Sequence, residues 1–372
     1  MAIDADAEYS LMNLLTVYLV KTFGKILAFV LPVFITLYLV VELVERIDEF
    51  VERQATLSVV MQYTLLRAPI IGAQVGPLAV LLSVALTIAL LERNREMIAF
   101  LAAGASPLRL ARPLLLGSLG IAAVTFCAEE YLLPGAHRGV MSLLERQTRP
   151  TPQSALVNQG EIWYRAPDAA FVHIELVEPA AQRIHGITIY RKGGTGDLVE
   201  QVEAAEGIWT GDHWTFLHGT ISRFRTNVAA DVDSFVHLDL AIGLEPADLR
   251  SMFTPPSHMS LSELRLYLRK LRGRGIDMLA YVIDFHTKLS APLMDVVMTM
   301  VGLAAMWGAR NARSISLGFA GTLCAAGGYW LLVTAGTALS RSQQLPLPLA
   351  IWLPHLVVLS LSTYVFWREA DA

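Results

Sequence analysis

The fold is decided by the stretch APIIGAQVGPLAVLLSVALTIALL, residues 68–91, which contains no Asp, Glu, Lys or Arg. A helix that spans the hydrocarbon core of a bilayer needs about 20 apolar residues. Each Leu, Ile, Val or Phe favours insertion by about 0.3–0.6 kcal/mol, whereas a central charge opposes it by about 2.5–3.5 kcal/mol. Residues 314–340 and 342–367 also lack these charges. These three stretches are therefore predicted to be membrane-spanning helices.

Three further apolar stretches complete a set of six spans, in two groups of three. They cover residues 26–41, 113–128 with a continuation to about 133, and 289–309. The last holds one acid, Asp295, whose cost of about 3 kcal/mol is outweighed by its apolar neighbours. The composition is 54% hydrophobic and 17% charged, with a mean hydropathy of +0.48, which excludes an ordinary soluble domain. We predict a membrane α-helical protein with six transmembrane helices around an inserted middle segment.

The basic residues near the spans predict the orientation of the chain. With a cytoplasmic amino terminus, nine of them flank the spans on the inside, namely Lys21, Lys25, Arg93, Arg95, Arg109, Arg112, Arg310, Arg313 and Arg368. Four lie in short outside loops, namely Arg46, Arg53, Arg67 and Arg341. Because cytoplasmic loops carry the excess of Lys and Arg, both termini are predicted to be cytoplasmic and the middle segment to lie outside. The net charge of −4 gives no sign of a nucleic-acid partner.

The middle segment alternates apolar and polar residues with the period of a β-strand. The apolar sets are Val172, Ile174 and Leu176; Ile187 and Ile189; and Val236, Leu238 and Leu240. Glycine-rich turns at 193–194, 196–197 and 211–212 separate the strands. We expect three parts: 1–134, an interfacial helix at 11–23 plus three spans; 135–257, an all-β extracytoplasmic jelly-roll domain; and 258–372, an amphipathic helix at 260–272 plus three spans.

Two interpretations of the apolar strand residues remain open. Val172, Ile174, Leu176, Ile187 and Ile189 either line a groove that receives acyl chains or fill the core of the β-domain.

The loop at 92–112 has a definite pattern. Met97, Ile98 and Leu101 form an apolar stripe, charges gather at 92–96, and Gly104 is expected to end a helix. Such a short helix suits docking into a groove on another protein. A solvated hairpin whose stripe rests on the bilayer fits the pattern equally well.

The sequence shows no pattern for catalysis or cofactor binding. It contains no phosphate-binding loop, no H-E-x-x-H motif, no Cys/His cluster with zinc spacing and no Ser/His/Asp arrangement. We therefore expect no catalytic, cofactor-binding or metal-binding residues. Cys127 and Cys324 fall inside apolar spans and are expected to be free, small hydrophobic residues.

Polar residues inside spans are costly and often functional. Glu42 lies near the outer end of the first span and is expected to extend to the interface, while Asp295 admits proton-coupled transport as an alternative. Asp284 is expected to pair with Lys288 four residues later. Gly72 and Gly76 form a G-x-x-x-G, which predicts close packing of another helix.

Several local motifs resemble the lipopolysaccharide-export permeases of the LptF/LptG family, with greater similarity to the LptG branch. The similar stretches, in chain order, are YTLLRAP at 63–69, REM at 95–97 through AAGAS at 102–106, QGEIW at 159–163, FVHI at 171–174, GITIY at 186–190 and HTKLSAPL at 286–293. Together they cover nearly the whole chain. The stretch at 95–106 is similar to that family's coupling helix. The three stretches between 159 and 190 are similar to its periplasmic jelly roll, and the stretch at 286–293 is similar to the start of its fourth span.

The resemblance implies a role as a non-catalytic permease subunit in the bacterial inner membrane, without cofactors. It implies a heterodimer of LptF and LptG type, a cytoplasmic LptB ATPase dimer, and periplasmic LptC and LptA jelly rolls that carry lipopolysaccharide towards the outer membrane. The ATPase-coupling helix would comprise Glu92, Arg95, Glu96, Met97, Leu101 and Gly104. Glu96 would reach polar groups of the ATPase, and Met97 and Leu101 would supply the buried contact.

One departure from the family concerns the outer end of the first span. The LptG branch carries lysines there, whereas this chain has Glu42, Glu45, Asp48 and Glu49 with Arg46 and Arg53. The cationic contacts to lipid phosphates are then expected at Arg46, Arg138 and Arg146, with Arg67 as a further candidate, or on the partner subunit. A glycolipid that depends less on its phosphates is a third alternative.

Two rival functions stay open. One is a scaffold that controls periplasmic partners without moving lipid, and the other is a membrane enzyme acting on glycolipid, against which the missing acid/base pattern argues.

Overall fold

The computed structural model describes residues 5–102, 104, 106–147, 162–166, 170–178, 182–193, 197–225, 228–240, 242, 246, 255–271, 278–311 and 315–371. The chain forms two compact units. The helical unit comprises Met1–Leu143, Ser260–Ser262 and Val282–Ala372, and the β unit comprises Leu144–Met259 and Glu263–Tyr281.

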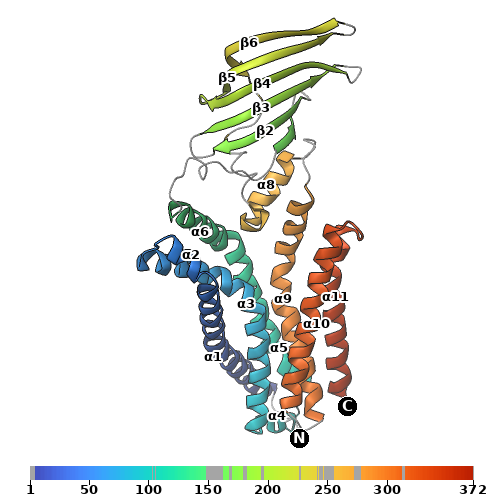
Figure 1. Ribbon diagram of the computed structural model, residues 1–372. Coiled ribbons are helices and arrows are strands. Elements are labelled where there is room, and N and C mark those ends of the chain that lie inside the picture. The colour runs from blue at the N-terminus through green and yellow to red at the C-terminus, as the bar shows by residue number, and fades with distance from the viewer. Residues whose placement is uncertain are drawn as a thin grey trace. The chain divides into compact units, whose positions relative to one another are not determined.

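Six helices are long and apolar enough to cross a membrane, as predicted (Figure 1). They lie in α1 (Ala5–Glu45), α3 (Leu57–Arg93), α5 (Pro107–Cys127) with its continuation, α9 (Leu279–Asn311), α10 (Ile315–Arg341) and α11 (Leu347–Asp371). Shorter helices are α2 (Ile47–Glu52), α4 (Glu96–Ala102) and α8 (Leu261–Leu271). The α8 bounds agree with the amphipathic helix expected at 260–272.

Two helix boundaries differ from the sequence prediction. The lead-in expected at 11–23 is continuous with the first span inside α1. The third span continues through a π-helical turn, Ala128–Leu132, into α6 (Leu133–Gln147). Residues 135–147 are therefore helical, although we expected the β-domain to begin there. The polar residues of α6 mark the end of the apolar span but not the end of the helix, which continues through them.

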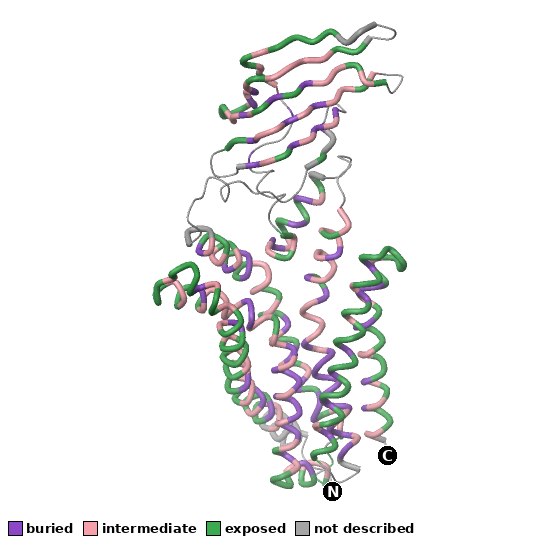
Figure 2. Tube along the Cα trace, in the orientation of Figure 1, coloured by how far each residue is buried: buried purple, intermediate pink, exposed green. Residues whose placement is uncertain are grey.

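The second and fourth spans form the centre of the helical unit. In each span we consider the 18 consecutive residues that are most apolar. The buried share of these residues is 67% in the second span and 61% in the fourth, against 11% in the first and 22% in the fifth (Figure 2). At the end that contains α4, a single apolar cluster joins six helices. Its members include Leu19, Phe23, Ile88, Met97, Leu114, Trp307 and Phe366. The first span is therefore peripheral along most of its length but packed at this end.

The closest helix contact at a glycine lies between α10 and α11. A Cβ on Gly336 would lie 2.2 Å from the carbonyl oxygen of Ala350, so only glycine fits. In the predicted G-x-x-x-G, a Cβ on Gly72 would lie 3.3 Å from Ile35 Cδ1, whereas Gly76 faces open space. The motif thus marks a close contact between α1 and α3 at Gly72 only, because a Cβ on its second glycine would meet nothing within 4 Å.

Gly336→Ala is expected to destabilise the helical unit by about 1–3 kcal/mol, because the added methyl group forces two backbones apart. Gly328 on the same helix has nothing within 4 Å of a built Cβ. Gly328→Ala should therefore be neutral or stabilising, since alanine is the better helix former. Thermal unfolding midpoints of the two purified variants provide the measurement, and equal midpoints would contradict the close contact.

The β unit contains one antiparallel sheet in which every strand pairs with the next along the chain. The strands are β1 (Ile162–Arg165), β2 (Phe171–Glu178), β3 (Arg183–Lys192), β4 (Leu198–Trp209), β5 (Trp214–Arg225) and β6 (Val228–Leu240). The inserted all-β domain is confirmed. Among the described residues the strands follow an up-and-down order, because short connections join each antiparallel neighbour.

The alternation of buried and exposed residues shifts by one residue at paired positions of neighbouring strands. On β2 and β3 the buried residues step by three, from Ile174 to Val177 and from Ile184 to Ile187. The slip lies at Gly186 and, on β5, at His218, whose φ angles are +61° and +50°. A left-handed residue rotates the strand that follows it, so counting by twos fails beyond it.

This slip corrects two predictions. Leu176 does not share the buried face of Val172 and Ile174, because Val177 takes its place. Val236 is 59% exposed, although it was grouped with Leu238 and Leu240. Ile187 and Ile189 are buried on the apolar face, as their alternation predicts.

Candidate functional site

The polypeptide reverses direction between α3 and α4 within two residues. The N–H groups of Asn94 and Arg95 donate to the carbonyls of Leu90 and Glu92, both at 3.0 Å, and Arg95 has a φ of +57°. α4 begins directly afterwards at Glu96. Gly104, with a φ of +84°, closes its end by donating to the Leu101 carbonyl at 3.0 Å. The predicted helix stop is therefore found, but Glu92 belongs to α3 and not to the loop helix.

The two faces of α4 have different environments. Met97 is 2% exposed and belongs to the apolar cluster at this end, and Leu101 packs against that cluster. Ile98 is 66% exposed. Met97 therefore does not offer the surface contact that we expected, because the chain uses it for its own core. Ile98, together with exposed Arg95, forms the accessible face of α4.

The carboxylate of Glu96 is bound on both oxygens. The Tyr18 hydroxyl of α1 donates to Oε2 at 2.8 Å, and the Asn94 side-chain amide donates to Oε1 at 3.2 Å. Sequence reasoning missed Tyr18, because it lies 78 residues from Glu96 and no local pattern links them.

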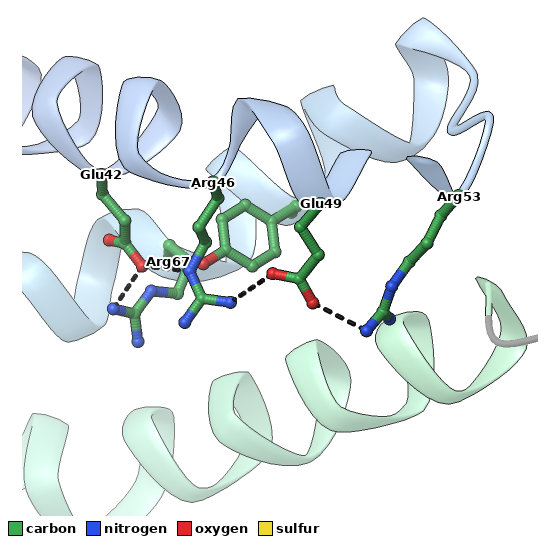
Figure 3. A network of polar contacts seen from close by, with 6 residues as sticks. Glu42, Arg46, Glu49, Arg53 and Arg67 are labelled. Carbon is green, nitrogen blue, oxygen red and sulfur yellow. Dashed lines mark hydrogen bonds and ion pairs between the residues drawn. The ribbon is translucent and has the colours of Figure 1, made fainter. Parts of the chain in front are cut away.

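At the opposite end of the helical unit, α1, α2 and α3 share a polar cluster (Figure 3). Glu42 of α1 is 6% exposed. Its Oε1 accepts a hydrogen bond from the Tyr63 hydroxyl at 2.7 Å and lies 2.5 Å from Arg67 Nη2. Arg46 Nε lies 3.7 Å from the same oxygen. Glu42 is thus bound inside the chain, and its predicted extension to the interface is wrong.

The polar cluster continues along α2. Arg46 pairs with Glu49 at 3.1 Å, and Glu49 pairs with Arg53 at 2.8 Å (Figure 3). The five charged residues are three arginines and two glutamates, so the cluster carries one positive charge in excess. Arg46 keeps 39% of its side chain exposed, against 22% for Arg67. Arg46 is therefore the more accessible cation of the two that contact Glu42.

The other candidate lipid contacts lie on α6. Arg138 is exposed, and the side chain of Arg146 lies outside the described part of the chain. α6 packs on α3 beside the polar cluster, because a Cβ on Gly139 would lie 3.0 Å from Leu66 Cδ2. Arg138 precedes Gly139 and Arg67 follows Leu66, so each arginine lies next to one of the two contacting residues. The structure brings these two helices together, although no spacing in the sequence links them.

Inside the spans, buried polar residues bond between helices. Asp295 is fully buried and accepts a hydrogen bond from Thr125 of α5 at 3.0 Å. Tyr329 of α10 and His355 of α11 share a hydrogen bond. Such bonds between spans stabilise helix packing, and no further polar contact to the Asp295 carboxyl is seen among the described residues.

Lys288 does not use the partner that helical spacing suggests. Its Nζ lies 3.0 Å from Glu129 in the π-helical turn, so Glu129 takes the ion pair that was expected for Asp284, and Asp284 interacts with Lys288 only at longer range. The neighbouring Glu130 accepts hydrogen bonds from the Leu261 N–H at 2.9 Å and from the Ser262 hydroxyl. Both acids of the π-helical turn therefore bind residues at least 131 positions away along the chain, which helical spacing does not indicate.

The described residues hold no group of three His, Cys, Asp or Glu side chains that fits a metal ion. Cys127 and Cys324 are free thiols.

The fold and these sites define a class: a multi-pass membrane protein with an inserted β-sheet domain and a short loop helix at one end of its spans. A family model described as "Lipopolysaccharide export system permease LptF/LptG" matches residues 17–368. The chain belongs to this family, which confirms the resemblance seen in the sequence and makes the chain a transport component.

Curated relatives agree with this assignment. The chain is 24% identical over 258 residues to the lipopolysaccharide export system permease protein LptG of Escherichia coli K12. The aligned region covers 69% of this chain and 70% of the relative. The LptG protein of Escherichia coli O6:H1 matches with the same values.

Proposed function

We propose that this chain is a permease subunit that extracts lipopolysaccharide from the bacterial inner membrane, with energy from a separate ATPase. The observation that carries the proposal is the family match over residues 17–368, which includes the spans, α4 and the sheet. Both termini and α4 would be cytoplasmic, and the β unit periplasmic, as the distribution of basic residues predicts. A second permease subunit of the LptF or LptG type would complete the membrane part.

The ATPase, a dimer of LptB type, would dock on α4. Its exposed face offers the apolar side chain of Ile98 beside the cation of Arg95, and Glu96 adds a carboxylate at the start of the helix. An apolar anchor surrounded by charges is typical of a short helix bound in a groove. Met97 and Leu101 would hold α4 on the spans, so that a force on the helix reaches the bundle.

The polar cluster of α1 to α3 would meet the phosphates of the lipid. It carries one excess positive charge, and Arg46 is its half-exposed cation. Arg138 on the neighbouring α6 would add to it. Because Glu42 and Glu49 already bind these arginines, a phosphate would have to share them, and the partner subunit would supply further cations.

The β unit would receive acyl chains and join the LptC and LptA jelly rolls. In the single chain, however, Val172 and Ile174 are fully buried, and Ile187 and Ile189 are 2% exposed. This burial favours the second candidate function, a scaffold that controls periplasmic partners without moving lipid. Lipid passage requires these residues to become accessible when the sheet opens.

Co-purification of the tagged full chain from its native membrane tests the proposal. We expect a nucleotide-hydrolysing subunit, a second permease and bound lipopolysaccharide to accompany it. Recovery of the chain with periplasmic proteins but without an ATPase or lipid would favour the scaffold. Turnover of glycolipid by the purified chain alone would favour a membrane enzyme.

A further inference from the structure

We infer that Tyr18 is a positioning residue that couples the ATPase-docking helix α4 to the first span. The inference rests on the proposed function, because it needs an ATPase on α4. Its basis is the hydrogen bond from the Tyr18 hydroxyl to Glu96 Oε2 at 2.8 Å, which joins the first span to the first residue of α4.

The polar link has an apolar counterpart one residue further along each helix. Leu19 follows Tyr18 and is fully buried, and Met97 follows Glu96 and is 2% exposed. Both belong to the apolar cluster at this end of the helical unit. α1 and α4 thus share one apolar cluster beside the hydrogen bond, so a displacement of α4 is passed to α1 at this place.

The remaining geometry keeps Glu96 in position without burying it. The Asn94 amide holds Oε1, and the left-handed Arg95 fixes the direction in which α4 leaves α3. A carboxylate has about four acceptor positions, of which these two bonds use two. A donor from the ATPase therefore adds to the Tyr18 bond and does not need to displace it.

The span that Tyr18 belongs to is the most exposed span of the helical unit. Only 11% of its most apolar window is buried, the lowest share among the six. Beyond the cluster it exposes large apolar residues, including Phe29 at 73% and Leu37 at 60%. The hydrogen bond of Tyr18 thus links α4 to the span that has most of its surface outside the unit.

The test uses two substitutions that separate coupling from docking. Tyr18→Phe removes the hydroxyl but leaves the Glu96 charge for the ATPase. Glu96→Gln removes the charge but keeps a side-chain oxygen that accepts from Tyr18. Tyr38→Phe is the matched control, because Tyr38 is 41% exposed on the same helix. Each variant is reconstituted as the full complex with the second permease and the ATPase, and the lipopolysaccharide released per ATP hydrolysed is measured.

For Tyr18→Phe we expect unchanged ATPase capture and about a threefold to tenfold fall in lipid released per ATP, the range that a typical hydrogen bond contributes in contact with solvent. Glu96→Gln should weaken capture, while the complexes that form keep their lipid-to-ATP ratio. The inference is overturned if Tyr18→Phe keeps the ratio of the Tyr38→Phe control. Loss of the ATPase, or of a purifiable complex, with Tyr18→Phe would also overturn it, since the hydroxyl would then serve docking or folding. Unchanged capture by both Glu96→Gln and Ile98→Asp would instead contradict the proposed docking.

Discussion

Glu42→Leu should destabilise the helical unit by about 3 kcal/mol, because removing one partner of a buried ion pair leaves the other charge uncompensated. Glu42 is 6% exposed and holds both Arg67 and the Tyr63 hydroxyl. The Arg67 side chain keeps 22% exposure, which places the cost at the lower end of the range for buried pairs. The measurement is the thermal unfolding midpoint of the purified chain in detergent.

The double variant Glu42→Leu/Arg67→Leu separates an ion pair from general packing. Replacing both charges by apolar groups is often neutral, so the double variant should unfold closer to the wild type than Glu42→Leu does. Glu45→Leu is the control, because Glu45 lies one turn away on the exposed side of α1. Equal effects of Glu42→Leu and Glu45→Leu would show that the polar cluster contributes no specific stability.

Ile98→Asp should reduce capture of the ATPase by about tenfold or more, because an apolar anchor at the centre of an interface contributes about 2 kcal/mol or more. Ile98 is 66% exposed, so the chain itself should tolerate the substitution. Co-purification of the ATPase with the tagged complex is the measurement.

Two further substitutions test whether the effect is specific to the exposed face of α4. Ile315→Asp, at the partly exposed start of α10, should leave capture unchanged. Met97→Asp should instead reduce the amount of folded chain, because it places a charge in the apolar cluster. If Met97→Asp folded normally and lost the ATPase while Ile98→Asp kept it, the assignment of the two faces of α4 would be wrong.

The six spans were predictable because membrane insertion depends on the summed hydrophobicity of a local window. The face of α4 that is buried was not predictable from the sequence. A helical pattern counted continuously through residues 92–104 places Met97 and Ile98 on one stripe, but the left-handed Arg95 ends α3 and restarts the helical phase at Glu96. Only the packing of Met97 against the bundle decides which of the two neighbours is buried.

The same limitation applies to the sheet and the ion pairs. The alternation in β2 predicted Val172 and Ile174 correctly, and it failed at Leu176, beyond the level of the left-handed Gly186. For Lys288, the local partner Asp284 was the only one that helical spacing indicates, whereas the observed partner Glu129 lies 159 residues away. Contacts between distant segments depend on the tertiary fold, which a local pattern does not encode.

Site-specific photocrosslinking on the apolar face of the sheet tests the central claim most directly. A photoreactive residue at Ile189, which is 2% exposed, is compared with one at Trp163, which is 50% exposed, in the reconstituted complex with lipopolysaccharide. We expect lipopolysaccharide adducts at 189 that require ATP hydrolysis and disappear with Ile98→Asp, and none that depend on ATP at 163. Adducts to protein alone at 189, with or without ATP, would contradict lipid transport by this chain.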